Sequence, residues 1–386
     1  MFNRLLTPTL KKAVQSFPVT ALTGPRQSGK TTLLQSTFPD YHYVSLESPD
    51  KLLQIQDDPR GFLTQTSKPW IIDEAQRFPP LFSYIQEYAD TQKKAGHFIL
   101  SGSQNFLLSQ HISQTLAGRV AILELLPLSY QEFKPFKSVS LWQYLFHGSY
   151  PRPYQENLDT DLWFNAYVRT YLERDVRDII YIKDLSQFQL FLRLCAGQHG
   201  QQLNLTTLAQ ACGISQTTAN TWLNILEASY IVFKLRPYFN NFKKRLVKTP
   251  KLYFYDSGIV CRLLGLQSPE QLLIHSSRGA IFEGFIISEI VKAFFAKGKT
   301  APIYYWRDHS GHEVDLLVDY GGKLLAFEMK STMTLTKDLV KGLQQWHAIS
   351  ELPHECGHIV YAGDEKLKFK EWSILPWQYD FKHLFE

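Results

Sequence analysis

The sequence predicts an α/β protein built from three successive regions, and three local patterns carry this prediction. The first is a glycine-rich stretch over residues 24–33, between a short apolar run and a segment of helical character. The second is a helix-turn-helix pattern that begins near residue 203, and the third is a strand hairpin with acidic residues over residues 314–330. Together with the prolines between them, these patterns predict regions 1–150, 151–265 and 266–386.

Composition narrows the class of protein. A content of 44% hydrophobic and 20% charged residues is typical of a globular protein in water, and a formal net charge of +5 is compatible with a nucleic-acid partner without proving one. Four scattered cysteines without a CxxC pair favour reduced thiols. No apolar run approaches the ~18 residues of a membrane helix, and the N-terminus lacks a signal-like apolar segment. We therefore expect a cytoplasmic protein with no membrane contact.

The stretch GPRQSGKTTL satisfies the pattern G-x-x-x-x-G-K-[ST]. Its glycines let the backbone curl so that successive N–H groups point inward and bind an anion. Lys30 is expected to reach the β- and γ-phosphates of a nucleotide, and the Thr31 hydroxyl is expected to coordinate Mg²⁺. The predicted nucleotide-binding residues are Gly24, Pro25, Arg26, Gln27, Ser28, Gly29, Lys30, Thr31 and Thr32.

A second acidic element follows some forty positions later. The apolar run 70–72 leads directly into Asp73 and Glu74, as in a Walker B element. Asp73 is expected to hold Mg²⁺ together with Thr31, and Glu74 is expected to polarise the attacking water.

Three further residues are candidates for a role around the γ-phosphate. The apolar run 97–100 ends in SGSQ, so Ser103, with Ser101 as second choice, could orient the water; the alternative is a simple loop turn. Arg119 is a candidate stabiliser of transition-state charge, either in cis or across the interface of a homo-oligomer. The alternative for Arg119 is a surface arginine at a helix end.

At this point a family resemblance becomes clear. In this order, GPRQSGKTTL, WIIDEAQRFPPLF, ILSGSQ, LAGRV and LPLSYQEF resemble the AAA-like ATPase family that carries a characteristic C-terminal domain of unknown function. The likeness continues through AYVRTYLERDVRDI, KLYFYDSGI, GAIFEGFIISEI and GHEVDLLV, so it covers nearly the whole chain. The resemblance implies a P-loop NTPase core that binds and hydrolyses ATP. It implies little about the biological role.

The middle region has a winged-helix layout. In NLTTLAQACGISQTTANTWL the turn falls over residues 213–215, with Ser215 as the cap of the second helix, and two strands follow. The predicted wing between these strands carries basic residues suited to phosphates, namely Lys243, Lys244, Arg245, Lys248 and Lys251. The polar residues of the second helix are uncharged, namely Gln216, Thr217, Asn220, Thr221 and Asn224. We expect DNA contact here; the alternative is a purely architectural domain.

The last region carries a second set of chemical groups. Residues 314–330 predict a hairpin that turns at Gly321 and Gly322. Glu328 and Lys330 share one face of the returning strand, and Asp315 begins the partner strand. An Asp followed by E-x-K on a hairpin resembles the PD-(D/E)xK fold, a restriction-endonuclease-like α/β domain. In that fold two carboxylates hold a divalent metal and the lysine orients or activates water for phosphodiester cleavage.

Glu283 adds a third carboxylate to this set. On a helical wheel of residues 281–295 it projects into the middle of the apolar face, whereas Glu289 lies at the edge. Because a buried carboxylate needs a partner, we expect Glu283, Asp315 and Glu328 to hold Mg²⁺ or Mn²⁺, with Lys330 catalytic. The alternative is an ion pair from Glu283 to Lys330 or Arg307 in a degenerate fold.

Two functional hypotheses follow. The first is a Mg²⁺-dependent ATPase acting on DNA, with hydrolysis coupled to binding or cleavage by the other two regions. The second is an ATP-controlled binding switch whose nuclease-like domain is a non-catalytic scaffold for a protein or DNA partner. The apparently complete set of carboxylates and lysine in the last region favours the first.

Overall fold

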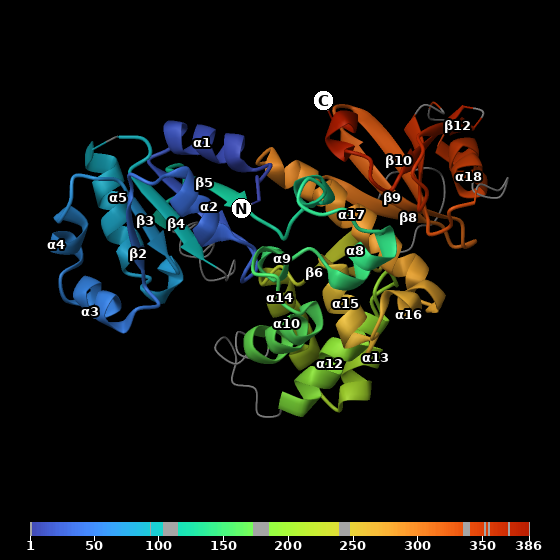
Figure 1. The fold of residues 1–386 in the computed structure, drawn as a ribbon, viewed down its shortest axis with the longest axis horizontal. Coiled ribbons are helices and arrows are strands. Elements are labelled where there is room, and N and C mark those ends of the chain that lie inside the picture. The colour runs from blue at the N-terminus through green and yellow to red at the C-terminus, as the bar shows by residue number, and fades with distance from the viewer. Residues whose placement is uncertain are drawn as a thin grey trace.

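The computed structural model describes residues 2–92, 94–102, 115–172, 185–238, 248–334, 340–350, 353, 356–369 and 371–385, with the backbone alone at 171 and 172. Within this part of the chain the strands form two sheets, which lie in separate lobes (Figure 1). A helical lobe, drawn in green and yellow, lies between and below them in Figure 1.

The N-terminal sheet is parallel and has the strand order β2-β3-β4-β1-β5. Its strands are β1 (Val19–Thr23), β2 (His42–Ser45), β3 (Trp70–Asp73), β4 (Phe98–Gly102) and β5 (Val120–Glu124). Every residue of β1, β3 and β4 is buried, as expected for parallel strands covered on both faces. The predicted P-loop α/β core is confirmed.

Helices cover both faces of this sheet because alternate strand residues point to opposite sides. On one face Leu22 and Ile71 pack against α1 (Thr7–Ser16) and α2 (Lys30–Thr37). On the other face Ala21 and Ile72 pack against three further helices and a 3₁₀ turn, namely α3 (Pro49–Asp57), α4 (Pro59–Thr64), α5 (Leu81–Gln92) and η1 (Ala75–Arg77).

The middle of the chain is mainly helical. Its elements are α7 (Tyr130–Phe133), α8 (Leu141–His147), α9 (Pro151–Gln155), α10 (Thr160–Tyr167), the π-helical turn η2 (Val168–Leu172), α12 (Leu185–Gly197), α13 (Leu205–Cys212), α14 (Gln216–Ala228), α15 (Ser257–Leu263) and α16 (Pro269–Ile274). The predicted pair of helices is present as α13 and α14. Gly213 ends α13 with φ of 64°, and Ser215 Oγ caps α14 by accepting a hydrogen bond from Thr218 N at 3.0 Å.

The second sheet is mixed and has the order β12-β13-β11-β10-β9-β8-β6-β7. Its strands are β6 (Val232–Pro237), β7 (Lys251–Phe254), β8 (Ile303–Arg307), β9 (Glu313–Tyr320), β10 (Lys323–Lys330), β11 (Gly357–Tyr361), β12 (Leu367–Phe369) and β13 (Trp372–Pro376). The long helix α17 (Arg278–Ala296) covers one face and α18 (Lys341–Ser350) covers the other, with the 3₁₀ turn η5 (Phe381–Leu384) beside α17.

Two features of this sheet bear on the predictions. The expected hairpin is confirmed: β9 and β10 are antiparallel, and Gly321 and Gly322 adopt φ values of 61° and 76° in the turn. Strand β6 pairs with β8 through Arg236 and Pro237, so strands from both sides of residue 265 share one sheet. Among the described helices, none is both long and apolar enough to cross a lipid bilayer.

Candidate functional site

The glycine-rich loop joins the carboxyl end of β1 to α2. Gly24 has φ of 148°, and a Cβ atom there would lie 2.2 Å from the carbonyl oxygen of Leu125, so only glycine fits against the end of β5. Gly29 has φ of 95° and is the N-cap of α2. The first backbone N–H groups of a helix have no partner within the helix, so a helix start can bind an anion.

The residues predicted to bind phosphate and Mg²⁺ lie together in this loop. Lys30 is buried, and its Nζ donates to the carbonyl oxygens of Gly24 and Pro25, each at 2.9 Å. Thr31 Oγ1 donates to Asp73 Oδ2 at 2.8 Å, which joins the start of α2 to the end of β3. A hydroxyl and a carboxylate at this spacing are hard oxygen ligands of the kind that Mg²⁺ binds, so these two residues fit that ion.

Asp73 accepts two further hydrogen bonds from neighbouring strands. Ser101 Oγ on β4 donates to Asp73 Oδ1, and Tyr43 OH on β2 donates to Asp73 Oδ2 at 3.0 Å. Ser101 therefore orients the carboxylate of Asp73, while Ser103 lies outside the described residues. Tyr43 was not identified as a site residue from the sequence. Its position near the carboxyl end of β2, the strand that pairs with β3, could have indicated it.

Glu74 has an uncommon backbone conformation for its residue type. Its φ and ψ are 54° and 42°, in the left-handed region that costs a non-glycine residue about 1 kcal/mol. Gln76 Nε2 donates to its carboxylate at 2.5 Å. Burial raises the pKa of Glu74, and the nearby charges of Lys30 and Arg26 act in the opposite direction. A carboxylate made more basic by burial is a better proton acceptor near neutral pH.

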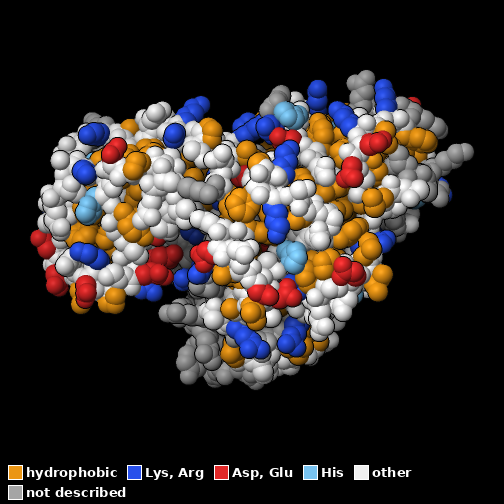
Figure 2. Space-filling view, viewed as in Figure 1, with side chains coloured by type: hydrophobic (Ala, Val, Ile, Leu, Met, Phe, Trp, Pro, Cys, Tyr) orange, Lys and Arg blue, Asp and Glu red, His pale blue; other side chains and the backbone are white. Residues whose placement is uncertain are grey.

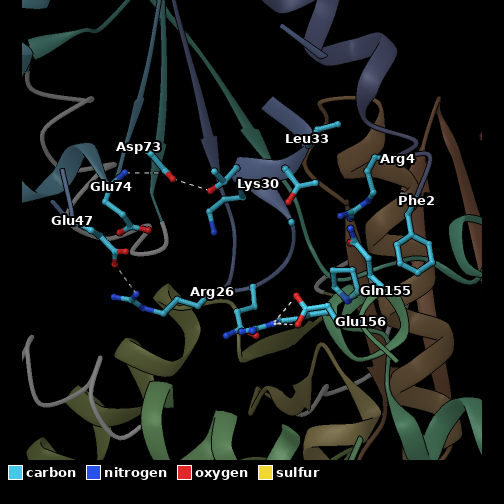
Figure 3. A pocket seen from close by; sticks show the side chains of 16 residues that line it. Phe2, Arg4, Arg26, Lys30, Leu33, Glu47, Asp73, Glu74, Gln155 and Glu156 are labelled. Atoms are coloured by element: carbon cyan, nitrogen blue, oxygen red, sulfur yellow. Dashed lines mark hydrogen bonds and ion pairs between the residues drawn. The ribbon is translucent and has the colours of Figure 1, made fainter. Parts of the chain in front are cut away.

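A cavity of about 360 Å³ opens around these groups (Figure 3). Figure 3 shows Lys30, Asp73 and Glu74 on one side of it and Arg4, Phe2 and Gln155 on the other. Its volume is within the range of small-molecule sites. Part of the wall comes from the middle region, through α9 and the residue after it, namely Pro151, Arg152, Gln155 and Glu156. In Figure 2 the surface is hollowed between the two lobes, with acidic and basic side chains along the hollow.

Arg4 was not found by sequence reasoning. It is buried, and its guanidinium donates to the carbonyl oxygens of Ser28 and Leu126, each at 2.6 Å, and pairs with Glu132 at 3.1 Å. It thus ties the loop to the segment that follows β5. A single arginine near the N-terminus carries no pattern that could have identified it.

Arg119 lies away from this cavity. Its carbonyl oxygen accepts from Val19 N, so it is at the amino ends of β1 and β5, whereas the loop follows their carboxyl ends. Its guanidinium is exposed and pairs with Asp90 of α5. The structure therefore does not support a role for Arg119 in cis, and its role across a subunit interface stays a prediction.

The loop and the end of β1 also contact the helical middle region. Trp163 Nε1 of α10 donates to Gln27 Oε1 at 3.1 Å. At the end of β1, the hydroxyl groups of Thr23 and Tyr230 are 2.7 Å apart. Tyr230 is the second residue after α14 and has φ of 57°. These contacts join the nucleotide loop and the end of β1 to α10 and to the end of α14.

Glu124 lies next to this second contact, paired in register with Thr23. Glu124→Gln is expected to raise the free energy of unfolding near neutral and alkaline pH. Burial raises the pKa of Glu124 from 4.5 to about 7, so the folded state binds more protons than the unfolded chain between these values. Stability of the wild type therefore falls as pH rises through that window. The variant lacks this cost and should gain up to about 3 kcal/mol above it.

Urea unfolding of both proteins at several pH values between about 4 and 8 measures this difference. The two proteins should be equally stable below pH 4.5, where both side chains are neutral, and should diverge above it. A difference in stability that is the same at every pH would contradict the prediction.

The residues of the predicted second metal site also come together. Glu283 lies on α17, Asp315 on β9, and Glu328 and Lys330 on β10. Lys330 Nζ is 2.6 Å from Glu328 Oε2, and Met329 N donates to Asp315 Oδ2 at 2.7 Å. Burial raises the pKa of Glu328, and the negative charge of Asp315 raises it further, while Lys330 opposes both.

The alternative had proposed Lys330 or Arg307 as the ion-pair partner of Glu283. The structure shows a different partner, Lys251. Lys251 Nζ, at the start of β7, lies 3.0 Å from Glu283 Oε1, and Tyr253 OH donates to the same oxygen. Burial raises the pKa of Glu283, and Lys251 lowers it. The prediction that Lys251 contacts phosphates as part of the wing is wrong, because its side chain is buried in this ion pair.

The apolar face of α17 differs from the prediction in one respect. Glu289 was expected at its edge, yet Glu289 is more deeply buried than Glu283. Glu289 pairs with Lys292 at 2.9 Å and accepts from Tyr130 N at 2.8 Å. Across the described ranges, no group of three or more His, Cys, Asp or Glu residues is arranged to hold a metal ion.

Comparison with known proteins identifies an AAA domain in the N-terminal part of the chain. Family models match residues 16–134 as an AAA domain, residues 138–270 as a domain of unknown function (DUF8612) and residues 278–379 as another (DUF4143). Uncharacterised proteins of Mycobacterium bovis and Mycobacterium tuberculosis are each 33% identical over 367 residues, which is 94% of this chain and 80% of theirs. The Walker-type ATPase of Pyrococcus abyssi is 16% identical with a TM-score of 0.47, covering 69% of this chain and 96% of that one.

The loop, the Walker B strand and the parallel sheet define an AAA-type P-loop ATPase. The chain belongs to the family in which this ATPase domain is joined to a C-terminal domain of unknown function, the DUF4143 domain.

Proposed function

We propose that this protein is a Mg²⁺-dependent ATPase that acts on DNA. The observation that carries the proposal is the placement of Lys30, Thr31, Asp73 and Glu74 around one cavity of nucleotide size. ATP hydrolysis that needs Mg²⁺ and is stimulated by duplex DNA is the expected result. Hydrolysis in the presence of EDTA, or no hydrolysis at all, would contradict it.

Each residue has a role in this reaction. Lys30 exchanges its two carbonyl partners for phosphate oxygens, and Thr31 and Asp73 hold Mg²⁺. When bound, Mg²⁺ neutralises charge on the β- and γ-phosphates. Glu74 accepts a proton from the attacking water, and Ser103 orients that water. Ser101 keeps Asp73 in position through its hydrogen bond.

DNA contact is assigned to the α13–α14 pair and the loop between β6 and β7, as a winged helix. On α14, Gln216, Thr217, Asn220 and Asn224 are exposed and present side chains that can hydrogen-bond base edges. Lys234 of β6 donates to Asn224 Oδ1 at 3.1 Å, and its charge is paired with Glu227 at 2.9 Å. Lys248 is exposed, whereas Lys243, Lys244 and Arg245 lie outside the described residues.

Alanine at Lys243, Lys244, Arg245 and Lys248 together is expected to weaken binding to all DNA sequences alike. Each lost phosphate contact should reduce the slope of log affinity against log salt by about one unit, because fewer counterions are released. Anisotropy of a labelled duplex at several salt concentrations measures this slope. Alanine at the exposed Lys51 of α3 is the control, and binding that ignores salt would favour an architectural role for the region.

A second candidate function is an ATP-controlled binding switch. The contacts that favour it are those from the loop region to α10 and to the end of α14, through Gln27 and Thr23. A switch needs nucleotide binding but not turnover, so the Glu74→Gln variant described in the Discussion separates the two. Cleavage of nucleic acid by Glu283, Asp315, Glu328 and Lys330 with Mg²⁺ or Mn²⁺ stays a prediction.

A further inference from the structure

We propose that the ammonium group of Lys251 takes the position of a divalent cation among the carboxylates of α17 and β9, so that this acidic cluster anchors the β6–β7 hairpin instead of holding a metal. The acidic cluster is defined as Glu283, Glu313, Asp315 and Glu328. The proposal departs from the metal site that the sequence predicts and does not depend on the ATPase assignment.

The contacts of Lys251 are those of a cation enclosed by carboxylates. Its Nζ lies 3.0 Å from Glu283 Oε1 and 2.5 Å from Glu313 Oε1, and it is 5.5 Å from the centre of the Tyr305 ring. The residue is 4% exposed. Such contacts link α17 and β9 to β7 through one charged group, and burial makes each of them stronger than at the surface.

Lys330 differs from Lys251 in its setting. Within the described residues, Glu328 is the one member of the acidic cluster that forms an ion pair with Lys330. The side chain of Lys330 is 33% exposed, compared with 5% for Lys251. The sequence predicts Lys330, the lysine of the E-x-K pattern, as the catalytic cation of this site. In the structure Lys251 of β7, which lies outside that pattern, is the more enclosed of the two lysines.

One oxygen of each of three carboxylates in the acidic cluster is already hydrogen-bonded by the protein itself. Glu283 Oε1 accepts from Lys251 and from Tyr253, Glu328 Oε2 from Lys330, and Asp315 Oδ2 from a backbone N–H. A divalent ion at this place would also lie beside the Lys251 ammonium, and like charges at such short range repel strongly where water is scarce. The residues as they stand therefore do not fit a metal.

In this arrangement the acidic cluster has a structural role, which is to anchor strand β7. Lys251 is the first residue of β7 and directly follows residues 248–250, where the loop between β6 and β7 ends. Nearby, Tyr305 OH donates to the carbonyl oxygen of Thr249, and Leu203 N donates to that of Pro250. The acidic cluster thus fixes the return strand of the hairpin to α17 and β9, beside the start of the α13–α14 pair.

The test counts Mn²⁺ bound to the full chain by electron paramagnetic resonance, without nucleotide so that the loop site does not contribute. Wild type is expected to bind no Mn²⁺ tightly. Lys251→Met keeps the length of the side chain and removes its charge, so it should bind one Mn²⁺ per chain about tenfold or more tightly than wild type does. Lys248→Met, three residues away and exposed, should behave as wild type.

A double variant, Lys251→Met with Glu283→Gln, assigns the new ion to the acidic cluster, because it should lose the binding that Lys251→Met gains. The proposal would be overturned, and the metal site supported, if the wild-type chain binds one Mn²⁺ and the Glu283→Gln variant does not. Lys251→Met that binds no Mn²⁺ would also overturn it. Should this variant fold poorly, its rescue by Mn²⁺ but not by K⁺ supports the proposal, and no rescue contradicts it.

Discussion

Replacing Lys30 by alanine is expected to abolish ATP hydrolysis and to weaken ATP binding. The ammonium group is the main side-chain charge aimed at the β- and γ-phosphates, so its loss should lower the turnover rate by at least about 10²–10³-fold. Loss of one charge-assisted contact should also weaken binding by about 10–100-fold. Steady-state hydrolysis and titration with a fluorescent ATP analogue measure the two effects.

The control is Lys11→Ala, which removes an exposed lysine of α1 in the same domain and should leave both quantities unchanged. Circular dichroism is needed for Lys30→Ala, because Lys30 also holds the carbonyl oxygens of Gly24 and Pro25. A folded Lys30→Ala protein with unchanged turnover would remove the assignment of the loop as the catalytic nucleotide site.

Glu74→Gln is expected to retain ATP and to fail to hydrolyse it. Glutamine keeps the shape of the side chain and can still accept the hydrogen bond from Gln76, but it cannot accept a proton from water. General-base catalysis contributes about 10²–10⁴-fold, so turnover should fall by that factor while affinity changes by about threefold or less. Single-turnover hydrolysis and equilibrium binding of ATP give the two numbers.

Glu87→Gln, on the exposed side of α5, is the matched control and should hydrolyse ATP at the wild-type rate. Equal losses of binding and turnover in Glu74→Gln would assign Glu74 a structural role. If the variant still binds DNA in an ATP-dependent way without hydrolysis, the binding switch becomes the better description of the protein.

Much of the nucleotide site could be predicted because its parts are local in sequence. The pattern of residues 24–31 specifies a strand, a loop and a helix start, and Asp73 and Glu74 stand at the end of the buried strand β3. Parallel strands bring such loops to one edge of a sheet. The same rule could have excluded Arg119 in cis, since it precedes β5 and so belongs to the opposite edge.

The rest could not be predicted because it depends on which distant segments meet. Arg4 reaches the loop across the N-terminal fold, and α9 closes the cavity from the middle region. Lys251 lies in a basic run that is typical of a solvent-exposed loop, whereas its contact with Glu283 depends on how β7 packs against the distant helix α17. The left-handed backbone of Glu74 has no signature in a sequence that places glutamate there.

The pairing of β6 with β8 also limits how evolution can recombine this chain. Family models separate residues 138–270 from residues 278–379, but a cut between them would break the β6–β8 pairing. Strand β8 and the β6–β7 hairpin would then each have a sheet edge with unpaired backbone donors and acceptors. Such open edges favour aggregation with other chains. In the described part of the chain the five-stranded sheet shares no strand with the eight-stranded sheet, so a cut between the two sheets would open no such edge. The β6–β8 pairing therefore predicts that the second and third regions are recombined as one unit.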